Sequence, residues 1–285
     1  MQTLSAMLAS MIVLSSVTKR FGSRLVLDHV SLRIEPGEFV CVTGPSGAGK
    51  STFIHMLIRA EVPTEGVVEV DGVDLAAVPP SILQMYRRRT GVVFQDTKLL
   101  SDRTVYENVA FAMEVCGDDD AVIAERVPIL LRQVGLLDRA SAFPRELSGG
   151  EKARAALARA LVHSPMIVIA DEPTGNVDPR QSLMIVDLLK AANAAGATVI
   201  LASHDRQIVD ALHVRVIRLE DGKVIRDSIG GYDAGTPSKT PVIDPRKHQI
   251  FESNAEKMSD GMKQNNPTED DAASGKSGKI KPIAI

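Results

Sequence analysis

One segment has the residue types and the spacing needed to bind phosphate groups. It reads Gly44-Pro45-Ser46-Gly47-Ala48-Gly49-Lys50-Ser51 and matches the P-loop pattern G-x-x-x-x-G-K-[ST] in full. Glycines allow backbone N–H groups to turn inward around phosphate oxygens, and a helix that begins there adds favourable positive potential. An apolar run precedes the loop, and a helical stretch over residues 51–59, starting with Ser51 and Thr52, follows it. The loop therefore predicts ATP binding, with Lys50 on the β- and γ-phosphates and Ser51 on Mg²⁺.

A second segment ends an apolar run with two acidic residues. Residues 166–170 are apolar, and Asp171 and Glu172 follow directly. A buried strand would deliver Asp171 to its carboxyl end, where the carboxylate can hold the Mg²⁺ shell, and Glu172 could polarise the attacking water as a general base. The plainer interpretation is an acidic pair at an exposed strand end, but the presence of a P-loop favours the catalytic one.

The third segment is Leu147-Ser148-Gly149-Gly150-Glu151. It predicts a helix start, with Ser148 as N-cap and Glu151 three residues later in a capping box. Two glycines at the start of a helix also let backbone amides approach an anion such as a γ-phosphate. The five-residue string is therefore a candidate second half of a nucleotide site.

Taken together, these motifs resemble the nucleotide-binding subunit of an ATP-binding cassette (ABC) protein, from about Met11 to Arg226. In that family the string from Ser148 to Glu151 is the signature, which completes the ATP site of the opposite subunit of a homodimer. The resemblance implies ATP hydrolysis. It also implies that Gln95 contacts the metal and senses the coupled partner, and that a D-loop ending at Asp178 crosses the dimer interface. The switch His204 would contact the γ-phosphate, and Phe21 would stack on the adenine. Two departures are visible: Phe21 stands where most relatives have Tyr, and Lys152-Ala153 precede Arg154 where relatives usually have two glutamines.

The pattern of apolar residues predicts an α/β fold of the P-loop ABC type. Val30, Leu32 and Ile34 alternate with polar residues, and residues 66–73 read as a hairpin, which together predict an N-terminal antiparallel β-subdomain. Short continuous apolar runs at residues 39–42, 92–94, 166–170 and 198–201 predict a mainly parallel core sheet. An inserted helical subdomain is expected at about residues 97–164. The predicted organisation is an extension over residues 1–10, an ATPase domain over 11–230 and a disordered tail over 231–285.

Composition narrows the class of protein. The 285 residues carry a net charge of −3, which gives no reason to expect nucleic-acid binding. Two cysteines suit a reducing compartment, and no run reaches the roughly 18 apolar residues that a membrane span needs. Any action at a membrane is therefore expected to pass through a partner.

The region from Val92 to Val109 narrows the resemblance within the family. Its Phe-Gln-Asp, Leu-Leu and Asp-Arg-Thr-Val-Tyr groups are similar to those of the cell-division subgroup. This resemblance implies an integral membrane subunit docked near Gln95–Leu100, with the chain held peripherally on the cytoplasmic side of the inner membrane. An exporter or lipoprotein-release ATPase is the alternative within the family. A binding module without turnover and a soluble ABC protein acting on DNA or ribosomes are alternatives from other classes.

Overall fold

The computed structural model describes residues 12–175 and 177–232. The predicted extension over residues 1–10, nearly all of the predicted tail over 231–285, and Asn176 of the D-loop lie outside the described residues.

The core of the molecule is a six-stranded sheet, in the order β10-β9-β3-β8-β7-β6. Neighbouring strands from β9 to β6 are parallel, and β10 is antiparallel to β9. Every residue of β3, β7 and β8 is buried, which explains why these strands read as continuous apolar runs. The strands are β3 (Phe39–Thr43), β6 (Thr90–Val93), β7 (Ile167–Asp171), β8 (Thr198–Ala202), β9 (Arg215–Glu220) and β10 (Lys223–Ile229).

A second, antiparallel sheet has the order β2-β1-β4-β5. Its strands are β1 (Ile12–Phe21), β2 (Arg24–Ile34), β4 (Glu65–Val70) and β5 (Val73–Asp74). Val30, Leu32 and Ile34 are buried while Arg33 is exposed, so the alternation expected for this strand is confirmed. The mainly parallel core and the antiparallel N-terminal sheet are the predicted fold class.

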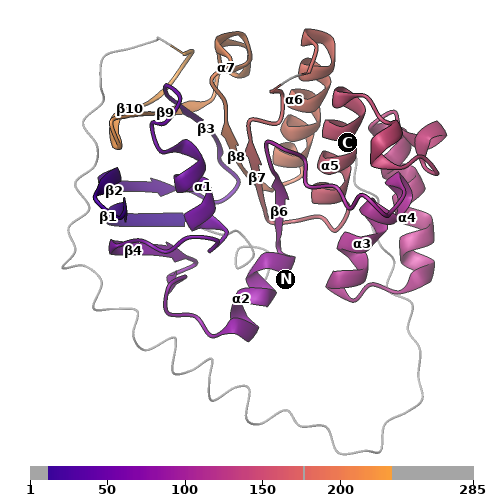
Figure 1. Ribbon diagram of the computed structural model, residues 1–285, viewed down its shortest axis with the longest axis horizontal. Coiled ribbons are helices and arrows are strands. Elements are labelled where there is room, and N and C mark those ends of the chain that lie inside the picture. Colours follow the sequence, from indigo (N-terminus) through magenta and orange to yellow (C-terminus); the bar gives the residue numbers. More distant parts are fainter. Residues whose placement is uncertain (1–11, 176, 233–285) are drawn as a thin grey trace, which may run out of the picture. The chain divides into compact units, whose positions relative to one another are not determined.

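Helices cover the core sheet and form most of the segment between β6 and β7. They are α1 (Lys50–Leu57), α2 (Pro80–Arg88), α3 (Val105–Cys116), α4 (Asp120–Gln133), α5 (Gly149–Leu161), α6 (Pro179–Ala194) and α7 (Arg206–Leu212). Helix α3 packs against both α4 and α5 (Figure 1). Helix α2 is not among the elements expected from the sequence, and none of its residues is fully buried. Among the described residues, no helix has both the length and the apolar character that crossing a membrane requires.

Alternate residues of the core strands face two apolar clusters. Cys41, Val168 and Leu201 belong to the cluster that includes α3, α4 and α5. Val42, Ile169 and Ala202 belong to the other cluster, together with α1 and the antiparallel sheet. The core sheet is thus buried on both faces, and its functional residues are expected at the strand ends.

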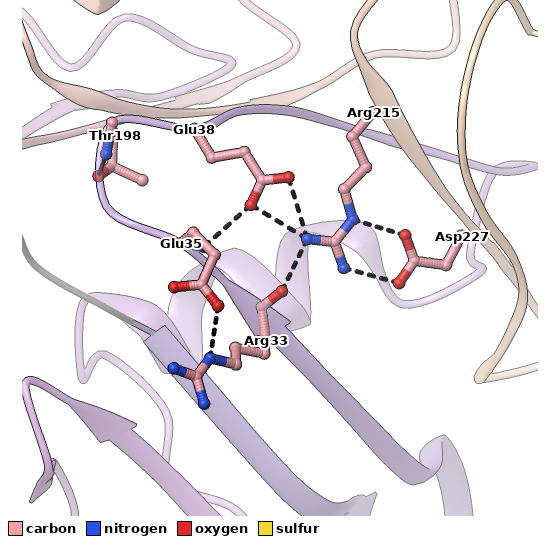
Figure 2. Close-up of polar contacts among 7 residues, drawn as sticks. Arg33, Glu35, Glu38, Thr198, Arg215 and Asp227 are labelled. Carbon is pink, nitrogen blue, oxygen red and sulfur yellow. Dashed lines mark hydrogen bonds and ion pairs between the residues drawn. The ribbon is translucent and has the colours of Figure 1, made fainter. Parts of the chain in front are cut away.

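Arg215 joins β9 to three other segments (Figure 2). Its Nε and Nη2 donate to the Asp227 carboxylate on β10 at 2.6 and 2.7 Å, and Nη1 donates to the Arg33 carbonyl on β2 at 2.7 Å. The same Nη1 lies 3.0 Å from Glu38 Oε2, just before β3. The hydrogen bonds and charge of Asp227, with a smaller contribution from Glu38, raise the pKa of Arg215. This guanidinium therefore ties the antiparallel sheet to the edge of the core sheet.

We expect Arg215→Met to lower the free energy of unfolding by about 3 kcal/mol, because it leaves two carboxylates facing each other without their cation. Urea denaturation monitored by circular dichroism would measure the loss. Arg33→Met is the matched control. Its ion pair with Glu35 is half exposed at both ends and should contribute less than about 1 kcal/mol. Equal losses in the two variants would contradict the role assigned to Arg215.

Candidate functional site

The loop between β3 and α1 has a backbone that its glycines make possible. Gly44 holds φ 142 and Gly49 holds φ 102, both in the region that favours glycine. A Cβ at Gly49 would lie 2.9 Å from the Val26 carbonyl oxygen, and a Cβ at Gly44 would clash with the Leu219 carbonyl oxygen. Lys50, the first residue of α1, is buried and donates from Nζ to the Gly44 carbonyl at 2.9 Å. The loop thus keeps a buried cation beside its inward-facing backbone.

This loop forms one wall of a cavity of about 360 Å³. Half of the predicted ATP-binding residues line it together, and with Glu172 the lining comes from four different segments of the chain. Gly44, Pro45 and Ala48 complete the loop without lining the cavity. The lining residues are Phe21, Arg24, Val26, Ser46, Gly47, Gly49, Lys50, Ser51, Thr52, Gln95 and Glu172.

The Glu172 carboxylate is the point where the polar side chains converge. His204 Nδ1 lies 3.0 Å from its Oε1, Lys50 Nζ lies 3.7 Å from the same oxygen, and Gln95 Nε2 lies 3.5 Å from Oε2. These groups follow β8, β3 and β6, so the parallel sheet brings them to the end of β7.

Glu172 also has an unusual backbone. Its φ is 47, a left-handed conformation that costs a residue with a side chain about 1 kcal/mol. Two hydrogen bonds hold it there, from Glu172 N to the Ala202 carbonyl at 2.9 Å and from Gly175 N to the Glu172 carbonyl at 3.0 Å. The strained turn aims the carboxylate into the cavity that it lines.

Asp171 is a buried carboxylate at the end of β7. Burial raises its pKa, and the nearby charge of Glu172 adds to the effect, while a hydrogen bond with Ser51 and the electrostatic effects of His55 and Lys50 oppose it. Within the part of the chain that the structure describes, its Oδ1 has no hydrogen-bond partner. A buried carboxylate oxygen next to a phosphate loop and the Ser51 hydroxyl could hold a hard divalent cation. No group of three His, Cys, Asp or Glu side chains suited to a metal occurs over residues 12–175 and 177–232.

The sequence motifs do not indicate Arg24 and Val26. In the structure Arg24 is paired in register with Phe21 across the turn that joins β1 and β2. The Phe21 ring is 46% exposed and has the Lys19 ammonium 4.7 Å from its centroid, while Arg24 Nη2 lies 3.8 Å from the position of a Cβ at Gly47. The hairpin register therefore adds a guanidinium beside the predicted stacking ring, and the two-residue turn Gly22-Ser23 is the local signal that predicts this pairing.

The predicted signature residues, Ser148, Gly149, Gly150 and Glu151, do not line this cavity, and neither does Asp178. The capping box is confirmed: Ser148 Oγ accepts from Glu151 N at 3.3 Å, and Glu151 Oε2 accepts from Ser148 N at 2.8 Å. The hydrogen bonds that Ser148 N and Ser148 Oγ donate to the Glu151 carboxylate lower the pKa of Glu151. Asp178 caps α6 by accepting from the backbone of Arg180 and Gln181, and the backbone hydrogen bond from Gln181 lowers its pKa most. Both groups therefore sit at helix N-termini, outside the cavity that the P-loop lines.

Comparison with known proteins agrees with the site. The ABC transporter family profile matches residues 27–175. The cell division ATP-binding protein FtsE of Bacillus subtilis (strain 168) is 47% identical over 228 residues, which cover 78% of this chain and 100% of that protein. FtsE of Escherichia coli (strain K12) is 41% identical over 213 residues, covering 74% and 96%. A solved dimeric post-hydrolysis state of an ATP-binding cassette bound to ADP and Pi has TM-score 0.71 and 34% identity, covering 76% of this chain and 98% of that one.

The chain belongs to the ABC transporter ATPase family, and it is an ATPase. The resemblance drawn from its motifs is confirmed, and so is the closer similarity to cell-division ATPases indicated by the segment around Gln95.

The raised pKa of Asp171 leads to a test of stability. Since the folded state holds the proton more tightly than the ordinary value of 3.8, ionised Asp171 destabilises the fold as pH rises above that value. We therefore expect Asp171→Asn to raise the free energy of unfolding at neutral pH by about 1 kcal/mol while abolishing turnover. The gain should shrink as pH falls toward 3.8. Urea denaturation at neutral and mildly acidic pH would measure it, with the exposed Asp187→Asn on α6 as control. A less stable variant at neutral pH would contradict this account.

Proposed function

We propose that the chain is the ATP-hydrolysing subunit of an FtsEX-like complex in cell division. Two copies would bind two ATP molecules, and an FtsX-like integral membrane subunit would receive the resulting movement. The observation that carries this proposal is the 47% identity over the whole length of FtsE from Bacillus subtilis. The chain would then lie peripherally at the cytoplasmic side of the inner membrane, held there by its partner.

The cavity supports specific roles in ATP binding. Phe21 would stack on the adenine, and the backbone and side chains from Gly44 to Thr52 would hold the phosphates. Mg²⁺ would be held by the Ser51 hydroxyl, the Asp171 carboxylate and the Gln95 amide oxygen, a set of oxygen donors that suits this ion. When bound, Mg²⁺ supplies positive charge that offsets the charge on the phosphate oxygens.

Glu172 would act as the general base. Its carboxylate would accept a proton from the attacking water, and the Lys50 ammonium lies 3.7 Å from its Oε1. The Gln95 amide, at 3.5 Å, would orient the carboxylate. His204, whose Nδ1 lies 3.0 Å from Glu172, would place its ring at the γ-phosphate. These roles use side chains from four strand ends that already meet.

A second copy of the chain would complete each site. The signature residues Ser148–Glu151 and Asp178 do not line the P-loop cavity of their own chain, which supports a role toward another copy. Solved relatives described as dimeric support the same arrangement. ATP would favour the closed dimer and hydrolysis would favour the open one, a ligand-driven shift of population.

The partner would dock in a groove of about 530 Å³ beside the segment Gln95–Leu100. Phe94, Phe111 and Val115 supply apolar surface in this groove, and Arg87 and Arg88 supply positive charge. Phe94 lines the groove while the next residue, Gln95, lines the nucleotide cavity. A movement of Gln95 on nucleotide binding would therefore directly displace Phe94 in the docking groove.

We expect Glu172→Gln to lower ATP turnover by at least about 100-fold, because the amide cannot accept the proton from water. ATP binding should persist, and an ATP-bound dimer should accumulate in size-exclusion chromatography. Glu125→Gln, an exposed position on α4, is the control and should behave like the wild type. Normal hydrolysis by Glu172→Gln would exclude Glu172 as the base.

We expect Val115→Glu to reduce recovery of the membrane subunit with the tagged chain by about tenfold or more, because it buries a carboxylate in an apolar contact. ATPase activity of the isolated chain should stay within about twofold of wild type. Ile129→Glu on α4 is the matched control, since Ile129 is 47% exposed against 44% for Val115 and does not line the groove. Equal recovery with both variants would place the docking surface elsewhere.

A further inference from the structure

Gln181, in the first turn of α6, contacts the two groups that lie outside the nucleotide cavity. Its Oε1 accepts a hydrogen bond from Arg154 Nη1 on α5, the signature helix. Its Nε2 donates to Asp178 Oδ2, at the end of the D-loop. One half-buried amide therefore uses both of its polar atoms to connect α5 with Asp178.

The same amide packs against Gly150 of the signature segment. A Cβ at Gly150 would clash with Oε1, Cδ and Nε2 of Gln181. Gly150 thus lets the α5 backbone approach the amide closely. Arg154 is itself fixed, because its Nε donates to the Val134 carbonyl after α4 at 3.0 Å. The start of α5 and the Gln181 amide consequently have little freedom to move separately.

A short loop continues this connection to Glu172. Asp178 Oδ1 accepts from the backbone N–H groups of Arg180 and Gln181 at 3.1 Å each, which ties Asp178 to α6. Val177 N donates to the Thr174 carbonyl at 3.3 Å, and Gly175 N donates to the Glu172 carbonyl at 3.0 Å. Only five residues separate Glu172 from Asp178, and Glu172 already holds a left-handed backbone. A displacement of Asp178 would therefore change the direction of the Glu172 carboxylate.

We propose that Gln181 is a positioning residue that links the signature segment to the general base of the same chain. Contact of Ser148–Gly150 with the ATP of a second copy would set the position of Asp178 through Gln181, and so the orientation of Glu172. This inference rests on the two-copy arrangement proposed above. Gln181 lies outside every sequence motif, and its proposed role is to make the orientation of Glu172 in one ATP site depend on the ATP bound in the other.

An amide is required here because one side must accept from a guanidinium and the other must donate to a carboxylate. Gln181→Glu keeps the acceptor for Arg154 but places a carboxylate against Asp178. Gln181→Leu removes both hydrogen bonds at similar volume. Neither change touches the nucleotide cavity, which Gln181 does not line.

The first test compares ATP binding with turnover in Gln181→Glu and Gln181→Leu. Binding of a fluorescent ATP analogue to the dilute chain should stay within about twofold of wild type, while kcat should fall about tenfold or more. Gln133→Glu, the same change at an exposed position at the end of α4, is the control and should leave both values unchanged. Wild-type turnover in both Gln181 variants would overturn the inference. Loss of analogue binding together with a lower melting temperature would also overturn it, because both indicate a structural role.

The second test exchanges the donor and the acceptor. In the double variant Gln181→Glu/Asp178→Asn, the new amide at position 178 can donate to the new carboxylate at position 181, and the hydrogen bond is restored with reversed polarity. We expect turnover at least about fivefold above Gln181→Glu alone, the non-additivity that a direct pair shows. Turnover equal to or below that of Gln181→Glu would overturn the inference.

The two proposals fail in different ways. If the chain carrying Glu172→Gln stays monomeric with ATP, the two-copy arrangement fails. If that dimer forms normally but the Gln181 variants hydrolyse ATP like the wild type, only the role of Gln181 fails.

Discussion

The parallel pairing of β3, β8 and β7 is the constraint on which the functional site depends. Val42 and Asp171 both pair in register with Ala202, so the three strands end at the same level. Two further hydrogen bonds extend this alignment beyond the strands, from Ser203 N to the Val42 carbonyl at 3.1 Å and from Glu172 N to the Ala202 carbonyl at 2.9 Å. The phosphate loop, Glu172 and His204 each follow one of these strands. Their convergence is therefore a consequence of strand register, which burial on both faces of the sheet fixes.

This edge of the sheet gathers groups that oppose stability. Lys50 and Asp171 are charged and buried, and Glu172 combines a half-buried carboxylate with a left-handed backbone. Each would cost free energy in an ordinary core. Two features outside the site offset that cost. The interiors of β3, β7 and β8 are apolar and buried, and Arg215 links the two sheets. The left-handed backbone of Glu172 and the buried charges of Lys50 and Asp171 thus lie where nucleotide chemistry can use them.

Two short connections, at Phe94–Gln95 and at Gln181, explain how nucleotide binding could move surfaces outside the nucleotide cavity. Phe94 and Gln95 are consecutive residues, yet Phe94 lines the groove proposed for docking and Gln95 lines the nucleotide cavity. Gln181 occupies a comparable position between α5 and Asp178. The first connection is a single peptide bond; in the second, Gln181 joins α5 to Asp178 directly and five residues lead on from Asp178 to Glu172. The rigid sheet supplies the fixed reference against which these segments would move.

The sequence by itself determined the features that depend on neighbours along the chain. These are the glycine loop ahead of α1, the alternation in β2, the apolar runs of the core strands and the capping box of Ser148 and Glu151, because each follows from local conformational and hydrogen-bonding requirements. It also identified Glu172, His204 and Gln95 through their order and their resemblance to a family. Only the tertiary structure decided what those residues contact. The reach of Arg215 from β9 to β2 and the hydrogen bond of Gln181 with Arg154 join positions that no local pattern connects. Such contacts follow from strand order and hairpin register, which the burial of the whole core selects.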